Sequence, residues 1–343
     1  MTAAPETILA YSGLELMGDG FMKIPFLRAL RGTWPQARIT WLAGKGRTVY
    51  AGPLGPLVAP YLDEIIEEAG IGLGPLELLR RPLAGRRFDI VIDTQRRVLT
   101  TLILRRARHR TFVSGAADFR LSDRRPAGPY RKPAAMVEQL LDLVRAAAGQ
   151  APALAPPPTL PEPYEAAARA ALPEGEIHLG LVPGAGGRQK CWPRERYVAL
   201  AREAAARGWR PAFVLGPAER DWLAALREAA PAARFPLQDR AVPAELAPSP
   251  LFTVAVGRCL ALAVTNDCGT AHMLAAAGTP LVSLFGPSAP RKFAPSTSDL
   301  TVIRAQDFGG EAMAAIPLAA VLAAVAHKLP AHPLRATASG APR

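Results

Sequence analysis

Short apolar runs alternate with helix-like stretches along most of the chain. The apolar runs predict buried strands at Thr7–Gly13, Ala37–Gly44, Phe88–Thr94, Ile177–Gly184, Pro211–Pro217, Leu260–Asp267 and Pro280–Pro287. Helical spacing of apolar residues predicts helices at Phe21–Arg31, Tyr197–Arg207, Arg220–Ala229 and Ala271–Ala277. This alternation is typical of parallel α/β units.

A proline-dense segment, Ala151–Pro163, interrupts the alternation and has neither helical nor strand period. It predicts a semi-rigid, extended linker. We therefore expect two domains, residues 1–155 and 156–330, followed by a flexible tail at 331–343. The expected fold class is α/β, with two doubly wound, Rossmann-like domains facing a central cleft. In such sheets the ligand lies outside the carboxyl ends of the strands.

The composition is that of a folded protein in a reducing compartment. Half of the residues are hydrophobic and 20% are charged, which predicts a sizeable core. The three cysteines, Cys191, Cys259 and Cys268, form no metal-binding or redox spacing. The N-terminus lacks the basic start of a secretory signal. The longest apolar tract, Ala312–Ala326, contains Pro317 and is too short to span a membrane. A soluble or peripheral cytoplasmic protein is expected.

Positive charge is concentrated in the first half of the chain. The formal net charge is +12, and eleven Lys and Arg residues between Arg96 and Lys132 face only two acids, Asp118 and Asp123. Such a field attracts anionic partners, and it allows peripheral contact with an anionic inner membrane. A solvated arginine-rich surface is the simpler alternative. Few aromatic residues are interleaved for base stacking, so a nucleic-acid or polyanion-binding module is disfavoured.

Two loops after the linker carry groups suited to a diphosphate. In the segment 266–272, Asp267 ends a strand, Gly269 permits close approach to the backbone, and Thr270 and His272 lie at a helix start whose free N–H groups attract anions. In the earlier segment 183–190, the loop offers N–H donors and positive charge through Gly186, Gly187, Arg188 and Lys190. Without a ligand, the segment 266–272 would simply cap the helix, and the segment 183–190 would be a loose glycine-rich turn.

Two carboxylates are candidates for other roles. Glu219 follows a strand at a helix start, where it can accept hydrogen bonds from ribose hydroxyls or simply complement the helix dipole. Asp19 lies between Gly18 and Gly20 before a predicted helix, where it is either an N-cap or a general base, with Lys23 in the same wall. Motifs of nicotinamide dehydrogenases, P-loop kinases and metal sites are absent from the sequence.

Taken together, four motifs resemble those of glycosyltransferase family 9, the ADP-heptose:lipopolysaccharide heptosyltransferases. They are Gly18–Asp19, VIDTQ at Val91–Gln95, the Pro183–Pro193 loop, and the Asn266–Pro287 segment, and they span roughly residues 6–295. The resemblance implies a GT-B fold with an N-terminal acceptor domain and a C-terminal donor domain. It also implies inversion at the anomeric carbon without a metal or another cofactor.

By position, Asp19 resembles the catalytic base, Lys190 the donor-phosphate lysine and Glu219 the ribose-binding residue of the family. Asp267, Gly269, Thr270 and His272 resemble its donor-binding turn. Acceptor contacts are expected from the basic residues of the first domain: Lys23, Arg96, Arg97, Arg120 and Arg124.

The implied partners are an ADP-heptose donor and an acidic glycolipid of the lipopolysaccharide inner core. The sequence departs from the family where an arginine often precedes Gly18–Asp19, and where Cys268 replaces Ser or Thr. Another nucleotide sugar or acceptor, and a catalytically silent assembly partner, therefore stay open as alternatives.

Overall fold

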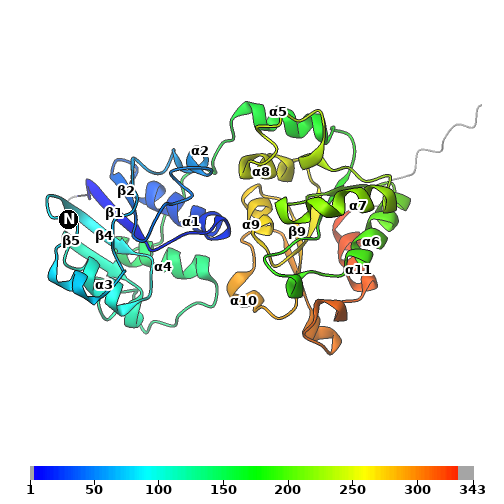
Figure 1. Cartoon of the computed structure of the whole chain (residues 1–343). Coiled ribbons are helices and arrows are strands. Elements are labelled where there is room, and N and C mark those ends of the chain that lie inside the picture. The colour runs from blue at the N-terminus through cyan, green and yellow to red at the C-terminus, as the bar shows by residue number, and fades with distance from the viewer. Residues whose placement is uncertain (1–3, 331–343) are drawn as a thin grey trace, which may run out of the picture. The chain divides into compact units, whose positions relative to one another are not determined.

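The computed structural model of the chain describes residues 4–330, so the expected tail at 331–343 lies outside the described residues. The chain divides into two compact units, Met1–Pro161 and Glu162–Arg343 (Figure 1). This division falls a few residues after position 155, inside the proline-dense segment. Each unit is described separately.

The first unit is built on a five-stranded parallel sheet. Its strands are β1 (Thr7–Ser12), β2 (Arg38–Ala43), β3 (Glu64–Ile66), β4 (Arg87–Asp93) and β5 (Arg108–Ser114). Their order across the sheet is β3-β2-β1-β4-β5. Nearly all side chains of β1, β2 and β4 are buried, which explains why these strands read as continuous apolar runs. The edge strands β3 and β5 carry charged residues and were not predicted.

Helices cover both faces of this sheet. They are α1 (Met17–Thr33), α2 (Gly55–Val58), α3 (Val98–Leu104) and α4 (Met136–Ala148), together with the 3₁₀ turns η1 (Pro75–Leu79) and η2 (Ala116–Phe119). Helices α1 and α4 pack against each other. Ile103 and Leu104 of α3 belong to a separate buried cluster with Leu9, Leu42 and Val91. The unit is therefore doubly wound.

Helix α1 begins at Met17 and not at Phe21, so the prediction that Gly18, Asp19 and Gly20 precede the helix was wrong. Gly18 and Gly20 lie inside the helix. A Cβ atom on Gly20 would lie 2.6 Å from Val49 Cγ2 and 2.9 Å from Leu54 Cδ1. This glycine allows close packing of the helix, a role that sequence alone does not separate from a turn.

The proline-dense segment is bound to the first unit. The backbone N–H of Ala155 donates to the Arg28 carbonyl at 2.9 Å, and Arg28 Nε donates back to the Ala155 carbonyl at 2.9 Å. The Tyr61 hydroxyl donates to the Pro156 carbonyl at 2.6 Å. A Cβ atom on Gly32 would lie 2.4 Å from the Ala153 carbonyl oxygen. The extended segment therefore runs directly against α1.

The second unit has a second five-stranded parallel sheet. Its strands are β6 (His178–Val182), β7 (Arg210–Phe213), β8 (Leu262–Asn266), β9 (Leu281–Phe285) and β10 (Leu300–Arg304), in the order β10-β9-β8-β6-β7. Four of these strands lie within or overlap the predicted apolar runs. The fifth, β10, is a partly exposed edge strand that was not predicted.

Seven α-helices flank this sheet among the described residues: α5 (Glu162–Ala171), α6 (Arg194–Ala206), α7 (Leu223–Ala229), α8 (Pro250–Arg258), α9 (Gly269–Ala276), α10 (Pro290–Phe293) and α11 (Leu318–Lys328). Helix α5 packs against α8, and α8 packs against α9. Buried residues of α6, α7 and α11 join those of β6 and β8 in one core cluster. No helix of the described chain is long and apolar enough to cross a membrane.

Each sheet has one point where the strand order reverses. In the first unit it lies between β1 and β4, and in the second between β6 and β8. Ligands of open α/β sheets bind outside the carboxyl ends of the strands that flank such a point. The loops after Ser12, Asp93, Val182 and Asn266 are therefore where binding groups are expected.

Candidate active site

In the second unit, the strands flanking the reversal point deliver an ion pair. Lys190 lies in the 3₁₀ turn η3 (Arg188–Lys190) after β6, and Asp267 directly follows β8. Lys190 Nζ donates to Asp267 Oδ2 at 2.7 Å and lies 5.9 Å from the centre of the Phe293 ring. Asp267 is 9% exposed, whereas the Lys190 side chain is 33% exposed. The ammonium group is thus held in place and remains accessible to an anion.

Arg188 lies two residues from Lys190 and is exposed. Within the described chain its guanidinium has no hydrogen-bond or ion-pair partner. Gly186 is exposed, and a Cβ atom there would meet nothing within 4 Å. The two cations and the open glycine turn provide positive charge and free backbone at one strand end.

Asn266 holds these loops together and was not recognised as important from the sequence. Its side-chain amide is completely buried. Nδ2 donates to the carbonyls of Pro183 at 2.9 Å and Gly184 at 3.3 Å. Oδ1 accepts from the Trp192 N–H at 3.1 Å and the Tyr197 hydroxyl at 3.2 Å. One residue at the end of β8 therefore fixes both ends of the glycine loop.

We expect Asn266→Ala to lower the free energy of unfolding by about 2–3 kcal/mol, because buried donors and acceptors on the loop lose their partner. Urea unfolding followed by circular dichroism measures this change. Gln189→Ala, which removes an exposed amide from the same loop, serves as the control and should change stability by less than about 0.5 kcal/mol. Equal stability of the two variants would contradict the clamping role.

Glu219 lies close to the same loop. It belongs to the 3₁₀ turn η4 (Pro217–Trp222) after β7 and is 8% exposed. A Cβ atom on Gly184 would lie 2.3 Å from Glu219 Oε1, and one on Gly216 would lie 2.9 Å from Oε2. Burial raises the pKa of this carboxyl, and the N–H groups of Gly216 and Glu219 act against the rise. Two glycines thus make room for one carboxylate beside the loop.

Helix α9 begins beside Asp267 with an unusual N-cap. Cys268 takes the extended N-cap position, which Ser, Thr, Asp or Asn usually fill. Burial raises the pKa of its thiol to about 12, opposed by the N–H groups of Ala271 and Thr270. Thr270 is half-buried and His272 is buried in the first turn. Gly269, Thr270 and His272 thus lie at the helix start, as predicted.

In the first unit, Asp19 lies in the first turn of α1 and is exposed. Its Oδ2 atom accepts a hydrogen bond from the Leu16 N–H at 3.4 Å. Leu16 is the N-cap, so Asp19 is the third residue of the helix and not its cap. The carboxylate complements the helix N-terminus and still faces solvent.

Lys23, one turn further along α1, is buried in polar contacts. Its Nζ donates to Ser12 Oγ at 2.6 Å and to Glu15 Oε1 at 3.3 Å, and lies 5.6 Å from the Trp41 ring centre. Burial lowers the pKa of Lys23, while the charges of Glu15 and Asp19 act against that change. The ammonium group orders the loop between β1 and α1.

Asp93, at the carboxyl end of β4, is a buried carboxylate of the VIDTQ motif. Oδ2 accepts from Thr101 Oγ1 at 2.6 Å and Ser114 Oγ at 3.0 Å, and Oδ1 accepts from the Gln95 N–H at 2.8 Å. Burial raises its pKa from 3.8 to about 6, against the effect of these hydrogen bonds. Asp93 thereby joins β4, β5 and α3 at the carboxyl end of the first sheet.

Because the folded state holds this proton more tightly than the unfolded state, Asp93 should make stability fall as pH rises from about 4 to about 6. At about 1.4 kcal/mol per pKa unit, the contribution lost is about 3 kcal/mol. Asp93→Asn should remove this part of the pH dependence, as measured by urea unfolding at several pH values. Parallel profiles for wild type and Asp93→Asn would refute the assignment.

The basic residues expected to contact an acceptor have different surroundings. Arg96 pairs with Asp118 at 3.1 Å and lies against Tyr130, with its guanidinium over Gly115. Arg124 Nη1 donates to the Ala147 carbonyl at 2.6 Å, which caps the end of α4. Arg97 and Arg120 are exposed. They are available to a ligand, whereas Arg124 already has a structural role.

The loop after β5 contains backbone strain that the sequence did not indicate. Ala117, Asp118 and Phe119 have positive φ angles of 48°, 52° and 64°. Three consecutive non-glycine residues in this region are costly and persist only where the surroundings hold them. Phe119 is buried and packs edge-on against Tyr130, with ring centroids 4.9 Å apart. The strained turn presents Asp118 to Arg96 at the carboxyl end of the sheet.

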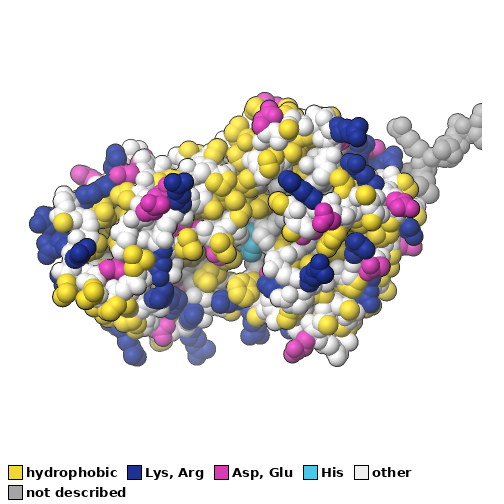
Figure 2. Space-filling view, viewed as in Figure 1, with side chains coloured by type: hydrophobic (Ala, Val, Ile, Leu, Met, Phe, Trp, Pro, Cys, Tyr) yellow, Lys and Arg dark blue, Asp and Glu magenta, His cyan; other side chains and the backbone are white. Residues whose placement is uncertain are grey.

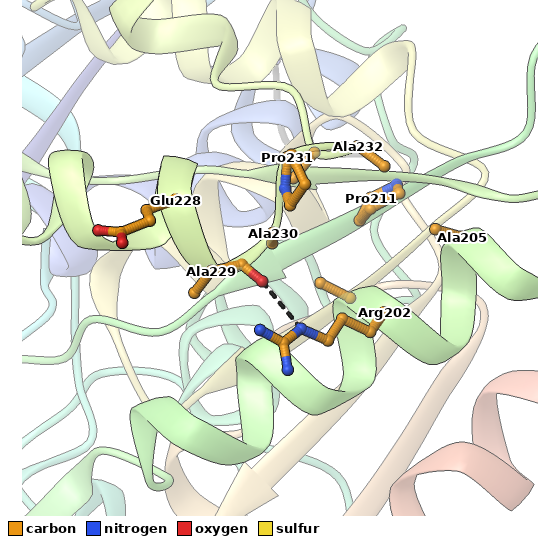
Figure 3. Close-up of a pocket in the computed structure, with 10 residues that line it drawn as sticks. Arg202, Ala205, Pro211, Glu228, Ala229, Ala230, Pro231 and Ala232 are labelled. Carbon is orange, nitrogen blue, oxygen red and sulfur yellow. Dashed lines mark hydrogen bonds between the residues drawn. The ribbon is translucent and has the colours of Figure 1, made fainter.

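The second unit also has a hollow that is separate from the candidate site residues. It has a volume of about 440 Å³ and is lined by α6, by the end of α7 with the segment that follows it, and by Pro211 of β7. Figure 3 shows Arg202 reaching across it, with Nε donating to the Ala229 carbonyl at 2.8 Å. None of the candidate site residues lines it. In the described chain, no group of three or more His, Cys, Asp or Glu residues is arranged to hold a metal ion.

Comparison with solved structures defines the class of fold as GT-B. A glycosyltransferase of family 9 from Veillonella parvula is 21% identical and has a TM-score of 0.66, over 93% of this chain and 96% of that one. The E. coli ADP-heptose lipopolysaccharide heptosyltransferase II is 23% identical, with a TM-score of 0.65, over 93% and 97% of the two chains. The E. coli heptosyltransferase WaaC with ADP is 18% identical, with a TM-score of 0.64, over 94% and 100%.

The sequence identifies the family within this class. The model of glycosyltransferase family 9 (heptosyltransferase) matches residues 77–313. The chain belongs to this family. The lipooligosaccharide heptosyltransferase 2 of Haemophilus influenzae is 32% identical over 130 residues, which cover 37% of this chain and 36% of that protein. The chain therefore matches about a third of the length of that curated relative.

Proposed function

We propose that the chain is an inverting, metal-independent glycosyltransferase that transfers a heptose or related sugar from an ADP-sugar to an acceptor of the lipopolysaccharide inner-core type. The observation that carries this proposal is the Lys190–Asp267 pair at the reversal point of the second sheet, at 2.7 Å. Membership of glycosyltransferase family 9 and the solved relatives named for ADP and ADP-heptose support the donor.

The second unit would bind the donor. Lys190 and Arg188 meet the diphosphate, and the N–H groups at the start of α9 add donors beside Gly269 and Thr270. The Asp267 carboxylate orients Lys190 through their ion pair. Glu219, with Gly186 and Gly187 nearby in the loop, would accept hydrogen bonds from the ribose hydroxyls, and His272 completes the turn.

The first unit would bind the acceptor and supply the base. Asp19 removes the proton of an acceptor hydroxyl, whose oxygen forms a bond to the anomeric carbon. The bond from that carbon to the diphosphate oxygen breaks, and its electron pair leaves with ADP. Lys190 and Arg188 stabilise the charge that develops on this leaving group, which is the work a metal ion does elsewhere. Arg96, Arg97 and Arg120 would meet acidic groups of the acceptor. Lys23 and Arg124 would hold the neighbouring elements of the first unit in place.

A thermal-shift panel of ADP, UDP, GDP and their sugars tests the donor. A ligand at one hundred times its dissociation constant stabilises the folded state by about 2.7 kcal/mol, so ADP and ADP-heptose should raise the melting temperature clearly. Transfer from ADP-heptose to a deacylated inner-core acceptor, measured with EDTA present, tests the reaction and its independence of metal. Preference for UDP or GDP, or loss of transfer in EDTA, would overturn the corresponding part.

A further inference from the structure

The guanidinium group of Arg96, in the loop after β4, is held by its surroundings. Nη2 donates to Asp118 Oδ1 at 3.1 Å, and Nη1 donates to the Tyr130 hydroxyl at 3.4 Å. A Cβ atom on Gly115 would lie 2.9 Å from Arg96 Nη1, so the group lies directly against the backbone there. An arginine fork held in this way is preorganised to bind the oxygens of a carboxylate or a phosphate.

The loop that carries Arg96 adjoins the loop that leads to Asp19. The Gln95 N–H donates to Asp93 Oδ1 at 2.8 Å, which fixes the start of the loop after β4. A Cβ atom on Gly13, the residue that follows β1, would lie 3.5 Å from the Gln95 side chain. An anion bound to Arg96 would therefore lie at the carboxyl ends of β1 and β4, on the side of the sheet where the helix with the proposed base begins.

Asp118 covers the accessible side of this guanidinium through a weak contact. The Asp118 side chain is 68% exposed, whereas that of Arg96 is 24% exposed. A single hydrogen bond, accepted by Oδ1, connects the two side chains. Ion pairs with one partner this exposed contribute little to stability. An oxyanion from solvent that makes two hydrogen bonds to the guanidinium can therefore replace the aspartate.

The turn that delivers Asp118 to the guanidinium is strained. Ala117, Asp118 and Phe119 have φ angles of 48°, 52° and 64°, a region that residues other than glycine rarely adopt. Phe119 is buried, and the Ala116 N–H donates to Ser114 Oγ at 3.1 Å, so both ends of the turn are anchored. Ala117 and Asp118 are exposed. The turn is free to relax at these two residues once the carboxylate leaves the guanidinium.

Positive charge surrounds this contact. Arg97 and Arg120 are exposed, and their side chains make no hydrogen bond or ion pair within the described chain. The segment 120–132 contains five Lys and Arg residues and one acid, Asp123. Figure 2 shows Lys and Arg side chains along the lower margin of the first unit, where the loop before α4 runs in Figure 1. This field raises the local concentration of anions that compete with Asp118.

We propose that Asp118 takes the place on Arg96 of a phosphate or carboxylate group of the acceptor, a ligand whose identity rests on the proposed function. The acceptor displaces Asp118 when it binds, Arg96 then donates to the ligand, and the strained turn relaxes. Because a ligand must displace Asp118, its apparent affinity is reduced. An anion that makes one weak contact with Arg96 gains too little to bind, so the contact selects for acceptors with a well-placed oxyanion.

Titration of the full chain with inorganic phosphate, and in a parallel arm with glucuronate, tests the displacement without a nucleotide sugar. The melting temperature reports binding, in about 0.05 M NaCl to limit screening. Asp118→Asn removes the charge and keeps a residue that tolerates positive φ, so the turn should keep its shape. The dissociation constant should fall about fivefold, because a weak ion pair no longer competes. A preference for phosphate or for glucuronate supports the proposal and identifies the acceptor group.

Glu68→Gln is a matched control for Asp118→Asn. Glu68 also has a positive φ angle, 53°, and its side chain is 67% exposed and pairs with Arg47 at 3.7 Å. It follows β3, at the opposite edge of the sheet from β5. Its replacement removes an equally exposed carboxylate from the same unit and should leave the dissociation constant within about twofold of wild type.

Ala117→Gly should act in the opposite direction. Glycine adopts a positive φ angle at little cost, so this change stabilises the turn in the form that holds Asp118 on Arg96. The dissociation constant for the anion should rise about threefold. The melting temperature without ligand should not fall.

Arg96→Gln identifies the part of the signal that arises at this contact, and it should weaken anion binding about tenfold. In the Arg96→Gln background, Asp118→Asn should have no further effect, since both changes act through one pair. In transfer assays, the effect of Asp118→Asn should appear as an approximately fivefold lower KM for the acceptor and not as a higher kcat.

Three results would overturn the proposal. The first is anion binding by Asp118→Asn that is no tighter than that of Glu68→Gln. The second is tighter binding that persists when Arg96 is replaced as well. The third is absence of anion binding to both wild type and Asp118→Asn. Tighter anion binding by Asp118→Asn in a protein that transfers no sugar would support the displacement and count against the transferase function alone.

Discussion

Replacing Asp19 by asparagine is expected to lower the turnover number for sugar transfer by about 10²- to 10⁴-fold, the range typical for loss of a general base. Asparagine keeps an oxygen that can accept from the Leu16 N–H, so the start of α1 should stay intact. ADP binding should also stay unchanged, because the donor residues lie in the second unit. Transfer kinetics and nucleotide thermal shifts on the same preparation measure both effects.

Glu138→Gln is a closely matched control for Asp19→Asn. Glu138 is the third residue of α4, exposed in the first helical turn of the same unit, as Asp19 is in α1. Neutralising it removes a similar interaction with the helix dipole and should leave turnover within about twofold of wild type. Comparable losses in the two variants would show that helix electrostatics, and not proton removal, explains the effect. Substantial turnover by Asp19→Asn would remove Asp19 as the base.

The second large effect is expected for Lys190→Ala, which should lower turnover by about 10²- to 10³-fold, as removal of a preorganised charge-stabilising donor does. It should also abolish the thermal shift produced by ADP. Part of any loss in stability would come from Asp267, which keeps a largely buried charge without its partner. The double variant Lys190→Ala with Asp267→Asn should regain stability without regaining transfer.

Lys292→Ala controls for the loss of a positive charge in this region. Lys292 also lies over the Phe293 ring, at 4.9 Å from its centre, and is exposed. It makes no ion pair in the described chain. Its replacement should change turnover by less than about threefold. If Lys292→Ala and Lys190→Ala reduced transfer equally, general electrostatic attraction would account for the result.

The sequence predicted the buried strands well and the edges poorly. Strands β1, β4, β6, β8 and β9 are covered on both faces, so burial alone requires a continuous run of apolar residues. Strand β5 begins Arg-His-Arg and was read as part of a basic segment, and β3 has only three residues. Edge strands need few apolar side chains, because one side faces solvent. Their pairing depends on neighbours that are distant in sequence.

The candidate site divides in the same way. The strand-end loops and their residues, such as Lys190 and Asp267, were predictable because parallel sheets place ligands at carboxyl ends. The ion pair between them spans 77 sequence positions and is visible only in the fold. Asn266 and Asp93 were overlooked because their importance rests on partners from several elements. Arg124 was expected to contact a ligand because it is a basic residue, yet its guanidinium caps α4.

The cysteine at the start of α9 and the other two native cysteines have thiols of low reactivity. Burial raises the pKa of all three native thiols, Cys191, Cys259 and Cys268, and that of Cys268 reaches about 12. Thiolate is the reactive form, so these positions should react slowly with maleimides at neutral pH. A single cysteine introduced at an exposed position should therefore accept a fluorophore selectively, without prior removal of the native ones.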